Sequence, residues 1–286
     1  MKNILCPVDF NEHSWNAVLY GAELARILNA NLILFHSYHY EKINVGDNFT
    51  TYTSVIPGFS YNESKDKAEA YLQKLKNDFP ELHSRFSYLL KSGFVYDEIL
   101  SAIKETNASM VVMSTEGAHG FAGVFLGSLT SDLIESVKIP LLAIPAGHPY
   151  KPWKYIVYAS DLEEEDTSLI EFTIHIAKPH NAHIALLHVA DYPDTEKKRE
   201  LTYQLEHTIY LQQYKNYSLH VIRDTDVVRG VQQYADIADA DLIIMAMHKR
   251  NFLEKIFTQS YTKELAKHTH IPLLALHKDE IIPFNN

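Results

Sequence analysis

The sequence lacks several features that would point to particular classes of protein. Its single cysteine, Cys6, excludes an internal disulfide. No apolar run is long enough to cross a membrane, and no signal-peptide-like apolar segment follows the opening Met-Lys-Asn. Residues 1–150 and residues 151–286 each carry a net charge of −5, which disfavours nucleic-acid binding because that needs a basic face. We therefore expect a cytoplasmic protein with no membrane or nucleic-acid partner.

One stretch near the middle of the chain combines a strand, a glycine loop and a helix. Residues 110–113 are apolar without alternation, which is typical of a parallel strand buried on both faces. Gly117 follows, and nine residues separate it from Gly127, which precedes Ser128. After Ser128, apolar residues recur at helical spacing. Such a unit presents backbone N–H groups and a positive helix end to an anion, although a glycine-bearing surface turn is the alternative.

The pattern of the first half recurs in the second half. An offset of 152 relates residues 2–5 to 154–157 and residues 30–36 to 182–188. Further along the chain, an offset of 132 relates residues 110–113 to 242–245 and residues 139–143 to 271–275. The change of offset assigns an insertion to residues 39–61 of the first half. This insertion is interpreted as either a functional lid or a plain loop.

The repeated pattern predicts two α/β domains of the doubly wound class. Each half alternates strands and helices, so we expect five mainly parallel strands in the order 3-2-1-4-5, flanked by helices. The predicted domains are residues 1–147 and 153–286. The linker, residues 148–152, contains two prolines and is therefore expected to be short and stiff.

In such sheets, ligands bind beyond the carboxyl ends of the strands. Asp9 is predicted to end the first strand, and its carboxylate suits a ribose hydroxyl or an adenine edge. Ser128 suits a phosphate oxygen. The alternative for both is capping of the helix that follows. No lysine follows Gly127 as in a Walker A loop, and no G-x-G-x-x-G follows the first strand, so the P-loop and classical dehydrogenase readings are weak.

The residues together resemble the universal stress protein family. The resemblance rests on Pro7-x-Asp9, a strand ending in His36, Met113-Ser114-x-x-Gly117, and Gly127-Ser128-x-Thr130 nine residues later. The tandem repeat resembles the two-domain members, and the likeness covers the chain outside residues 39–61. It implies a Rossmann-like fold of the adenine nucleotide alpha hydrolase-like type. It also implies binding of ATP or a related adenine nucleotide, either alone or together with Mg²⁺.

The resemblance also implies site residues. Adenine and ribose contacts are expected from Pro7, Asp9, Ser37 and Met113. Phosphate contacts are expected from Ser114, Gly117, Gly127, Ser128, Leu129 and Thr130. Two residues depart from the family pattern: Ser114 stands where a glycine is usual, and Glu116 would repel a triphosphate if it faced the site.

The second half departs further from the nucleotide motif. Its matching positions are Ala246, Lys249, Gln259 and Ser260, with Ala159 in place of Pro7 and Asp161 retained. Side chains at the former glycine positions would crowd a phosphate, so the motif is expected to be degenerate there. The basic cluster at residues 248–250 is interpreted as a solvated loop tip, with anion binding as the alternative.

The histidines are expected to be structural. His36 and His188 occupy matching strand ends, and His175, His180 and His183 have no H-E-x-x-H or cysteine cluster beside them, so no metal site is predicted. The resemblance implies that residues 141–144 pair with residues 273–276, so that the two halves form an intramolecular pseudo-dimer. A homodimer is compatible with the same pattern.

Three hypotheses about function follow. The leading one is a stress-response protein that binds ATP in its N-terminal half as a regulatory module, with no catalytic residue. The second is a nucleotide-independent module that acts through protein contacts. The third is a slow ATPase or autokinase in which Ser128 or Thr130 handles phosphate.

Overall fold

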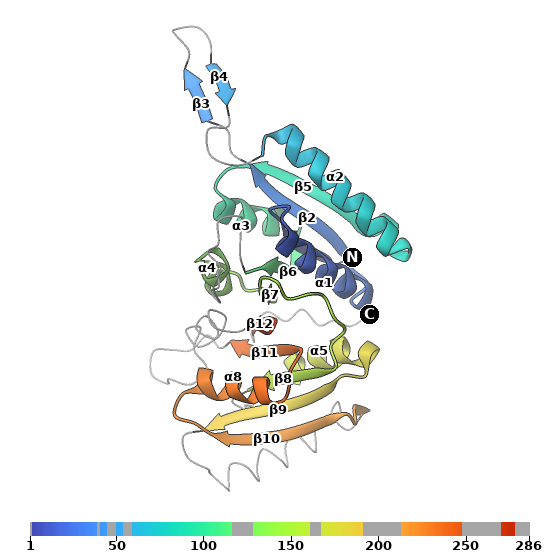
Figure 1. The fold of residues 1–286 in the computed structure, drawn as a ribbon, viewed down its shortest axis with the longest axis vertical. Coiled ribbons are helices and arrows are strands. Elements are labelled where there is room, and N and C mark those ends of the chain that lie inside the picture. The colour runs from blue at the N-terminus through green and yellow to red at the C-terminus, as the bar shows by residue number, and fades with distance from the viewer. Residues whose placement is uncertain are drawn as a thin grey trace. The chain divides into compact units, whose positions relative to one another are not determined.

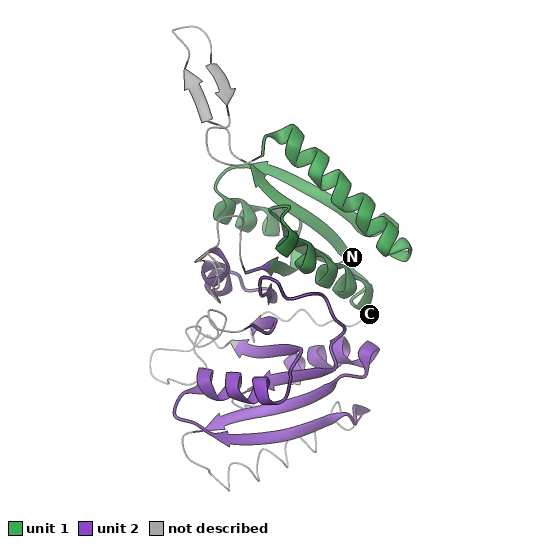
Figure 2. Ribbon diagram, viewed as in Figure 1, with its two compact units in different colours: residues 1–113 green, residues 114–286 purple. Residues whose placement is uncertain are grey.

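The computed structural model describes residues 2–38, 41–44, 50–53, 59–115, 128–160, 167–190, 213–247 and 270–277. Contacts divide the chain into two compact units, residues 1–113 and 114–286 (Figure 2). Among the described helices, none combines the length and the apolar character needed to cross a membrane.

The first unit is built on four parallel strands in the order β6-β1-β2-β5 (Figure 1). Its elements are β1 (Asn3–Pro7), α1 (Glu12–Ile27), β2 (Asn31–Tyr38), β3 (Glu41–Asn44), β4 (Thr50–Thr53), α2 (Tyr61–Asp78), a 3-10 turn (Pro80–Arg85), β5 (Phe86–Ser92), α3 (Val95–Glu105) and β6 (Ala108–Ser114), whose last residue falls in the second unit. This is the 3-2-1-4 part of the predicted order, and the prediction is confirmed.

The helices of this unit cover both faces of the sheet. Right-handed crossovers place α1 and α2 on one face and α3 on the other. Side chains of β5 follow this arrangement. The Tyr88 hydroxyl lies 3.3 Å from a carboxylate oxygen of Glu69 in α2, whereas Lys91 Nζ lies 2.7 Å from Ser101 Oγ in α3. The central strand β1 is fully buried through Ile4–Cys6, and burial raises the pKa of the Cys6 thiol well above its usual range.

In the second unit, the described strands follow the order β10-β9-β8-β11-β12-β7. Its elements are α4 (Ser128–Ser136), β7 (Leu141–Ile144), β8 (Tyr155–Ala159), α5 (Thr167–Ala177), a 3-10 turn (Lys178–His180), β9 (His183–Ala190), β10 (Tyr217–Arg223), α8 (Val227–Ile237), β11 (Leu242–Met247) and β12 (Leu273–His277). The strands of the second half, β10-β9-β8-β11-β12, are all parallel and confirm the order 3-2-1-4-5.

The fifth strand of the first half, β7, belongs to the second unit because it pairs with β12. The pairing is antiparallel, with Leu142 opposite Leu274 and Ala143 opposite Leu273. Both strands are buried along their length. The pairing of residues 141–144 with the strand that begins at Leu273 is therefore confirmed, while the predicted domain limits at residues 147 and 153 stay a prediction.

The structure differs from the sequence predictions at two places in the first half. The first strand ends at Pro7 and not at Asp9, because the chain turns at Phe10, whose φ is +60°. The insertion at residues 39–61 contains an antiparallel strand pair, β3 with β4, which the sequence pattern did not indicate.

A glycine in α8 lets that helix approach the sheet closely. A Cβ at Gly230 would lie 2.8 Å from Val189 Cγ1 and 3.2 Å from Asp224 Cβ. We expect Gly230→Ala to lower the free energy of unfolding by about 1–3 kcal/mol, since overpacking outweighs the better helix propensity of alanine. Chemical denaturation measures this. Gly21→Ala in α1 is the control, because its Cβ would meet the mobile end of Leu32 at 3.0 Å, and a smaller loss is expected.

Candidate functional site

Three predicted site residues lie at the carboxyl ends of neighbouring parallel strands in the first unit. Pro7 ends β1 and pairs with Phe35 of β2, two residues before Ser37. The register of β1 with β6 pairs Leu5 with Val111, and its continuation brings Pro7 beside Met113. The chain reverses its direction across the sheet between β1 and β6, which makes this edge the topological switch point where such folds bind ligands.

Asp9 lies just beyond the end of β1 and is held by Asn11. Its carboxylate accepts hydrogen bonds from Asn11 Nδ2 at 2.9 Å and from the Asn11 backbone N–H at 3.2 Å. Asn11, and not Asp9, is the N-cap of α1, since its side chain accepts from the Ser14 N–H at 2.7 Å. The capping alternative for Asp9 is therefore wrong. The half-exposed carboxylate is fixed in direction and retains acceptor positions for a ligand hydroxyl.

His36 stabilises the same edge from β2. Its Nδ1 donates to the Val8 carbonyl at 2.7 Å, because a carbonyl oxygen can only accept. Burial lowers the pKa of His36, although the Val8 carbonyl and the Asp9 charge oppose this effect. The second half repeats the contact, with His188 Nδ1 lying 3.0 Å from the Ser160 carbonyl. Both histidines therefore have the structural role that their matching positions predict.

Aromatic side chains that are far apart in the sequence gather around His36. The Phe10 ring lies 4.7 Å from the His36 ring and 5.2 Å from the Tyr71 ring, and Phe59 lies 6.0 Å from His36. Lys67 places its ammonium 4.3 Å from the Phe59 ring centre, which is a cation–π contact. The positive φ of Phe10 turns this ring toward α2, and no periodic pattern signals such a turn.

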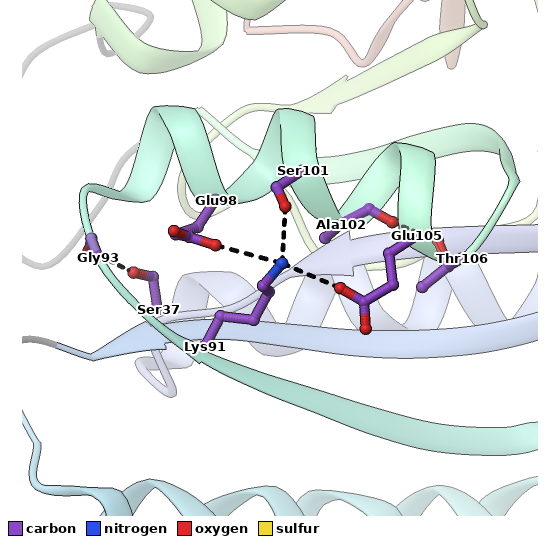
Figure 3. Close-up of polar contacts among 8 residues, drawn as sticks. All are labelled: Ser37, Lys91, Gly93, Glu98, Ser101, Ala102, Glu105 and Thr106. Atoms are coloured by element: carbon purple, nitrogen blue, oxygen red, sulfur yellow. Dashed lines mark hydrogen bonds and ion pairs between the residues drawn. The ribbon is translucent and has the colours of Figure 1, made fainter.

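Ser37 is tied to the start of α3. Its hydroxyl donates to the Gly93 carbonyl at 2.7 Å, so the side chain is engaged within the protein and only its backbone is left for the expected adenine contact (Figure 3). Beside it, Lys91 joins β5 to α3 through Ser101 at 2.7 Å, Glu105 at 2.9 Å and Glu98 at 3.3 Å. The hydrogen bond from Lys91 to Glu105 raises the pKa of the lysine. This cluster fixes the position of α3 on the sheet.

Ser114, at the end of β6, has a buried hydroxyl with no hydrogen-bond partner in the described part of the chain. α4 begins at Ser128 and continues through Leu129 and Thr130, of which Thr130 is buried. Gly117, Gly127 and Glu116 lie outside the described residues. Within those residues, no group of three or more His, Cys, Asp and Glu side chains is arranged to hold a metal ion.

In the second half, alanines occupy the positions that match Pro7 and Ser114. Ala159 ends β8 and is fully buried, and Ala246 in β11 is buried in the same way. Neither offers the hydroxyl that Ser114 presents in the first half. Asp161, Lys249, Gln259, Ser260 and the basic residues 248–250 lie outside the described residues.

The fold and its strand-end residues define a doubly wound α/β protein with two related halves. The model of the universal stress protein family matches residues 1–145 and 152–277, so the chain belongs to this family. The two matches correspond to the two halves of the internal repeat.

Individual relatives agree with this assignment. The universal stress protein MJ0577 of Methanocaldococcus jannaschii is 22% identical over 153 residues, which are 50% of this chain and 94% of that protein. A solved universal stress protein from Archaeoglobus fulgidus is 14% identical, with a TM-score of 0.65, and the match covers 96% of this chain and 98% of that one. A solved protein from Pseudomonas aeruginosa is similar to the same degree, with a TM-score of 0.66, 14% identity and coverage of 97% and 93%. The two structural matches support the tandem fold.

Proposed function

We propose that the N-terminal half of this universal stress protein binds ATP or a related adenine nucleotide and that the protein acts as a regulatory module in the cytoplasm. Pro7, Asp9, the Ser37 backbone and Met113 would contact adenine and ribose. The phosphates would be held by Ser114, Gly117, Gly127, Ser128, Leu129 and Thr130. Mg²⁺, where present, would neutralise phosphate charge.

The buried hydroxyl of Ser114 carries this proposal. A buried hydroxyl without a partner costs about 1–3 kcal/mol, so it needs an explanation in a folded protein. A phosphate oxygen beyond the end of β6 would accept its hydrogen bond and offset that cost. Asp9 supports the same reading, because Asn11 aims a half-exposed carboxylate near the end of β1.

Ser114→Ala provides a sharp test. Alanine removes the unpaired hydroxyl, so the unliganded protein should be as stable as the wild type or more stable. The affinity for ATP should fall by about tenfold, which corresponds to one hydrogen bond to a charged group. Thermal shift with ATP and AMP measures both effects.

The matched control is Ser64→Ala. Ser64 in α2 is also fully buried with an unpaired hydroxyl in the described structure, but it belongs to no expected nucleotide contact. Its removal should leave the affinity unchanged. If neither ATP nor AMP shifts the melting temperature of the wild-type protein, the proposal is contradicted. That result would favour the second hypothesis, a module that acts through protein contacts. Labelled phosphate on Ser128 or Thr130 would favour the autokinase.

A further inference from the structure

The start of β9 and β10 carries a chain of hydrogen bonds that nucleotide binding does not use. His183 Nδ1 lies 2.9 Å from Asn216 Oδ1, and His183 Nε2 lies 2.7 Å from Ser218 Oγ. Ser218 Oγ is also 2.7 Å from His220 Nε2. All four side chains are half-exposed, so small molecules can reach them.

The strand register explains why these side chains meet. Tyr217 of β10 pairs with Ile184 of β9, so the residues just before them, Asn216 and His183, are also opposite each other. Alternate residues of a strand share a face, which places Ser218 and His220 on the same side as Asn216. The sequence shows the histidines but not this convergence, because His183 is 33 residues from Asn216 and 35 residues from Ser218 in the chain.

The hydrogen bonds assign the protons. Asn216 Nδ2 donates to the Asn181 carbonyl at 2.7 Å, which directs Oδ1 toward His183 as an acceptor. Nδ1 of a neutral His183 must therefore be the donor, and its Nε2 is left to accept the Ser218 hydroxyl proton. His220 Nε2–H then donates to Ser218 Oγ. Burial and the nearby His183 lower the pKa of His220, which is consistent with a neutral ring.

We propose that Ser218, His183 and Asn216 form a second site, which cleaves carboxylic esters by nucleophilic catalysis. Ser218 would be the nucleophile, His183 the general base and Asn216 the positioning residue that holds the imidazole ring. The His220 Nε2–H donates to Ser218 Oγ and so helps to hold the nucleophile beside His183 Nε2. The proposal is independent of nucleotide binding in the first half.

The steps balance with water as the only co-reactant. Ser218 Oγ bonds to the ester carbonyl carbon while its proton passes to His183 Nε2. The intermediate collapses by breaking the bond to the alcohol oxygen, which takes the proton from His183. Water then attacks the acyl-serine and gives a proton to His183. Release of the carboxylic acid returns that proton to Ser218.

Aromatic rings indicate the class of substrate. The Tyr155 ring stacks on His183 at 5.0 Å, and the Tyr234 ring lies 5.0 Å from His220. The two tyrosine hydroxyls are 3.1 Å apart, so the rings are held together. Planar apolar walls of this kind suit a small ester with an aromatic alcohol.

The first half supplies an internal control. By strand register, Ser87 of β5 corresponds to Ser218, but Asn31 and Leu89 stand where the second half has His183 and His220. Ser87 is exposed and has no histidine at the two matching positions, so it should be unreactive.

A fluorophosphonate probe on the full-length protein, read by intact mass and peptide mapping, tests the proposal, with p-nitrophenyl acetate as the substrate for turnover. We expect one label on Ser218, none in Ser218→Ala, and normal labelling in Ser87→Ala. His183→Gln should slow labelling by about 100-fold, the loss of a general base. Absence of label in folded wild-type protein, or label that survives Ser218→Ala, would overturn the proposal.

Two further variants separate catalysis from folding. Ser218→Cys keeps a nucleophile beside His183 and should be alkylated by iodoacetamide faster than a Ser87→Cys control; equal rates would contradict the role of His183. Asn216→Ala should lower kcat for p-nitrophenyl acetate without raising KM, and Asn216→Asp should restore kcat, because either acceptor holds the His183 N–H. A merely structural Asn216 would not give this rescue.

Discussion

Replacing Gly127 by valine is expected to abolish ATP binding, and calorimetry on the wild-type protein is expected to give about one site per chain. The spacing of Gly117, Gly127 and Ser128 carries this prediction. A glycine lets a phosphate approach the backbone N–H groups, and a valine side chain would fill that space. Losing two charge-assisted hydrogen bonds, each worth about 1.5–3 kcal/mol, weakens binding by more than about 100-fold.

The matched control for Gly127→Val is Gln259→Val in the second half. It should leave the ATP affinity unchanged, because that position already carries a side chain. Gln259→Gly alone should not create a site, since Lys249 still crowds the loop. Glu116→Lys should tighten binding if this loop faces the phosphates. Two equivalent sites would show that both halves bind nucleotide, and a single site lost in Asp161→Ala but not in Gly127→Val would show that the second half binds it.

Asp241→Ala is expected to destabilise the second unit strongly. The Asp241 carboxylate is buried, and it accepts the backbone N–H groups of Lys154 at 2.7 Å and Tyr155 at 2.9 Å. Lys151 Nζ lies 2.7 Å from its other oxygen. Removing the carboxylate leaves two backbone donors without partners, so we expect a loss of about 3 kcal/mol in the free energy of unfolding.

The first half again provides the control for this variant. By the offset of 132, Ser109 corresponds to Asp241, and its hydroxyl makes one bond of 3.2 Å to the Asn3 carbonyl. Ser109→Ala should therefore cost about 1 kcal/mol or less. If both variants cost the same, the carboxylate does not anchor the start of β8.

The same carboxylate makes stability dependent on pH. Burial alone would raise the pKa of Asp241, but hydrogen bonds from Lys151, Lys154 and Tyr155 outweigh it and lower the pKa below the usual value. The stabilisation that the ionised Asp241 gives to the folded state is therefore present at neutral pH. It is lost as the pH falls from about 4, the usual pKa of an aspartate, through the lowered pKa of the folded state. Chemical denaturation of the wild type and of Asp241→Asn at pH 7 and pH 3 measures this. The free energy of unfolding should fall less between pH 7 and pH 3 in the variant than in the wild type. An equal loss would contradict this assignment.

The two halves use one fold for different chemistry. At the carboxyl ends of the strands, the first half has Pro7 and Ser114 where the second half has Ala159 and Ala246. On β9 and β10, the second half has His183 and His220 where the first half has Asn31 and Leu89. Central positions such as Leu5 in β1 and Val157 in β8 are apolar and fully buried in both halves, because the core has to pack closely.

The strand order was predictable from the sequence because it depends on local patterns and on the repeat. Apolar runs such as residues 110–113 and 242–245 define buried strands, and the constant offsets define two equivalent sheets. The strand pair β3–β4 was not predictable, since residues 39–61 have no clear period. The sequence left capping of the first helix by Asp9 open, but the N-cap of α1 is Asn11, because both residue types cap helices and only backbone geometry selects one.

Sequence by itself determined the family, the two-fold repeat and the strand order, because these follow from spacing along the chain. Tertiary structure alone decided which side chains meet across strands. The Asp9–Asn11 contact depends on a positive φ at Phe10, the buried hydroxyl of Ser114 depends on what surrounds β6, and the meeting of His183 with Ser218 depends on the register of β9 and β10. Hydrogen bonds act over about 3 Å in space, and spacing along the chain does not encode distances between separate strands.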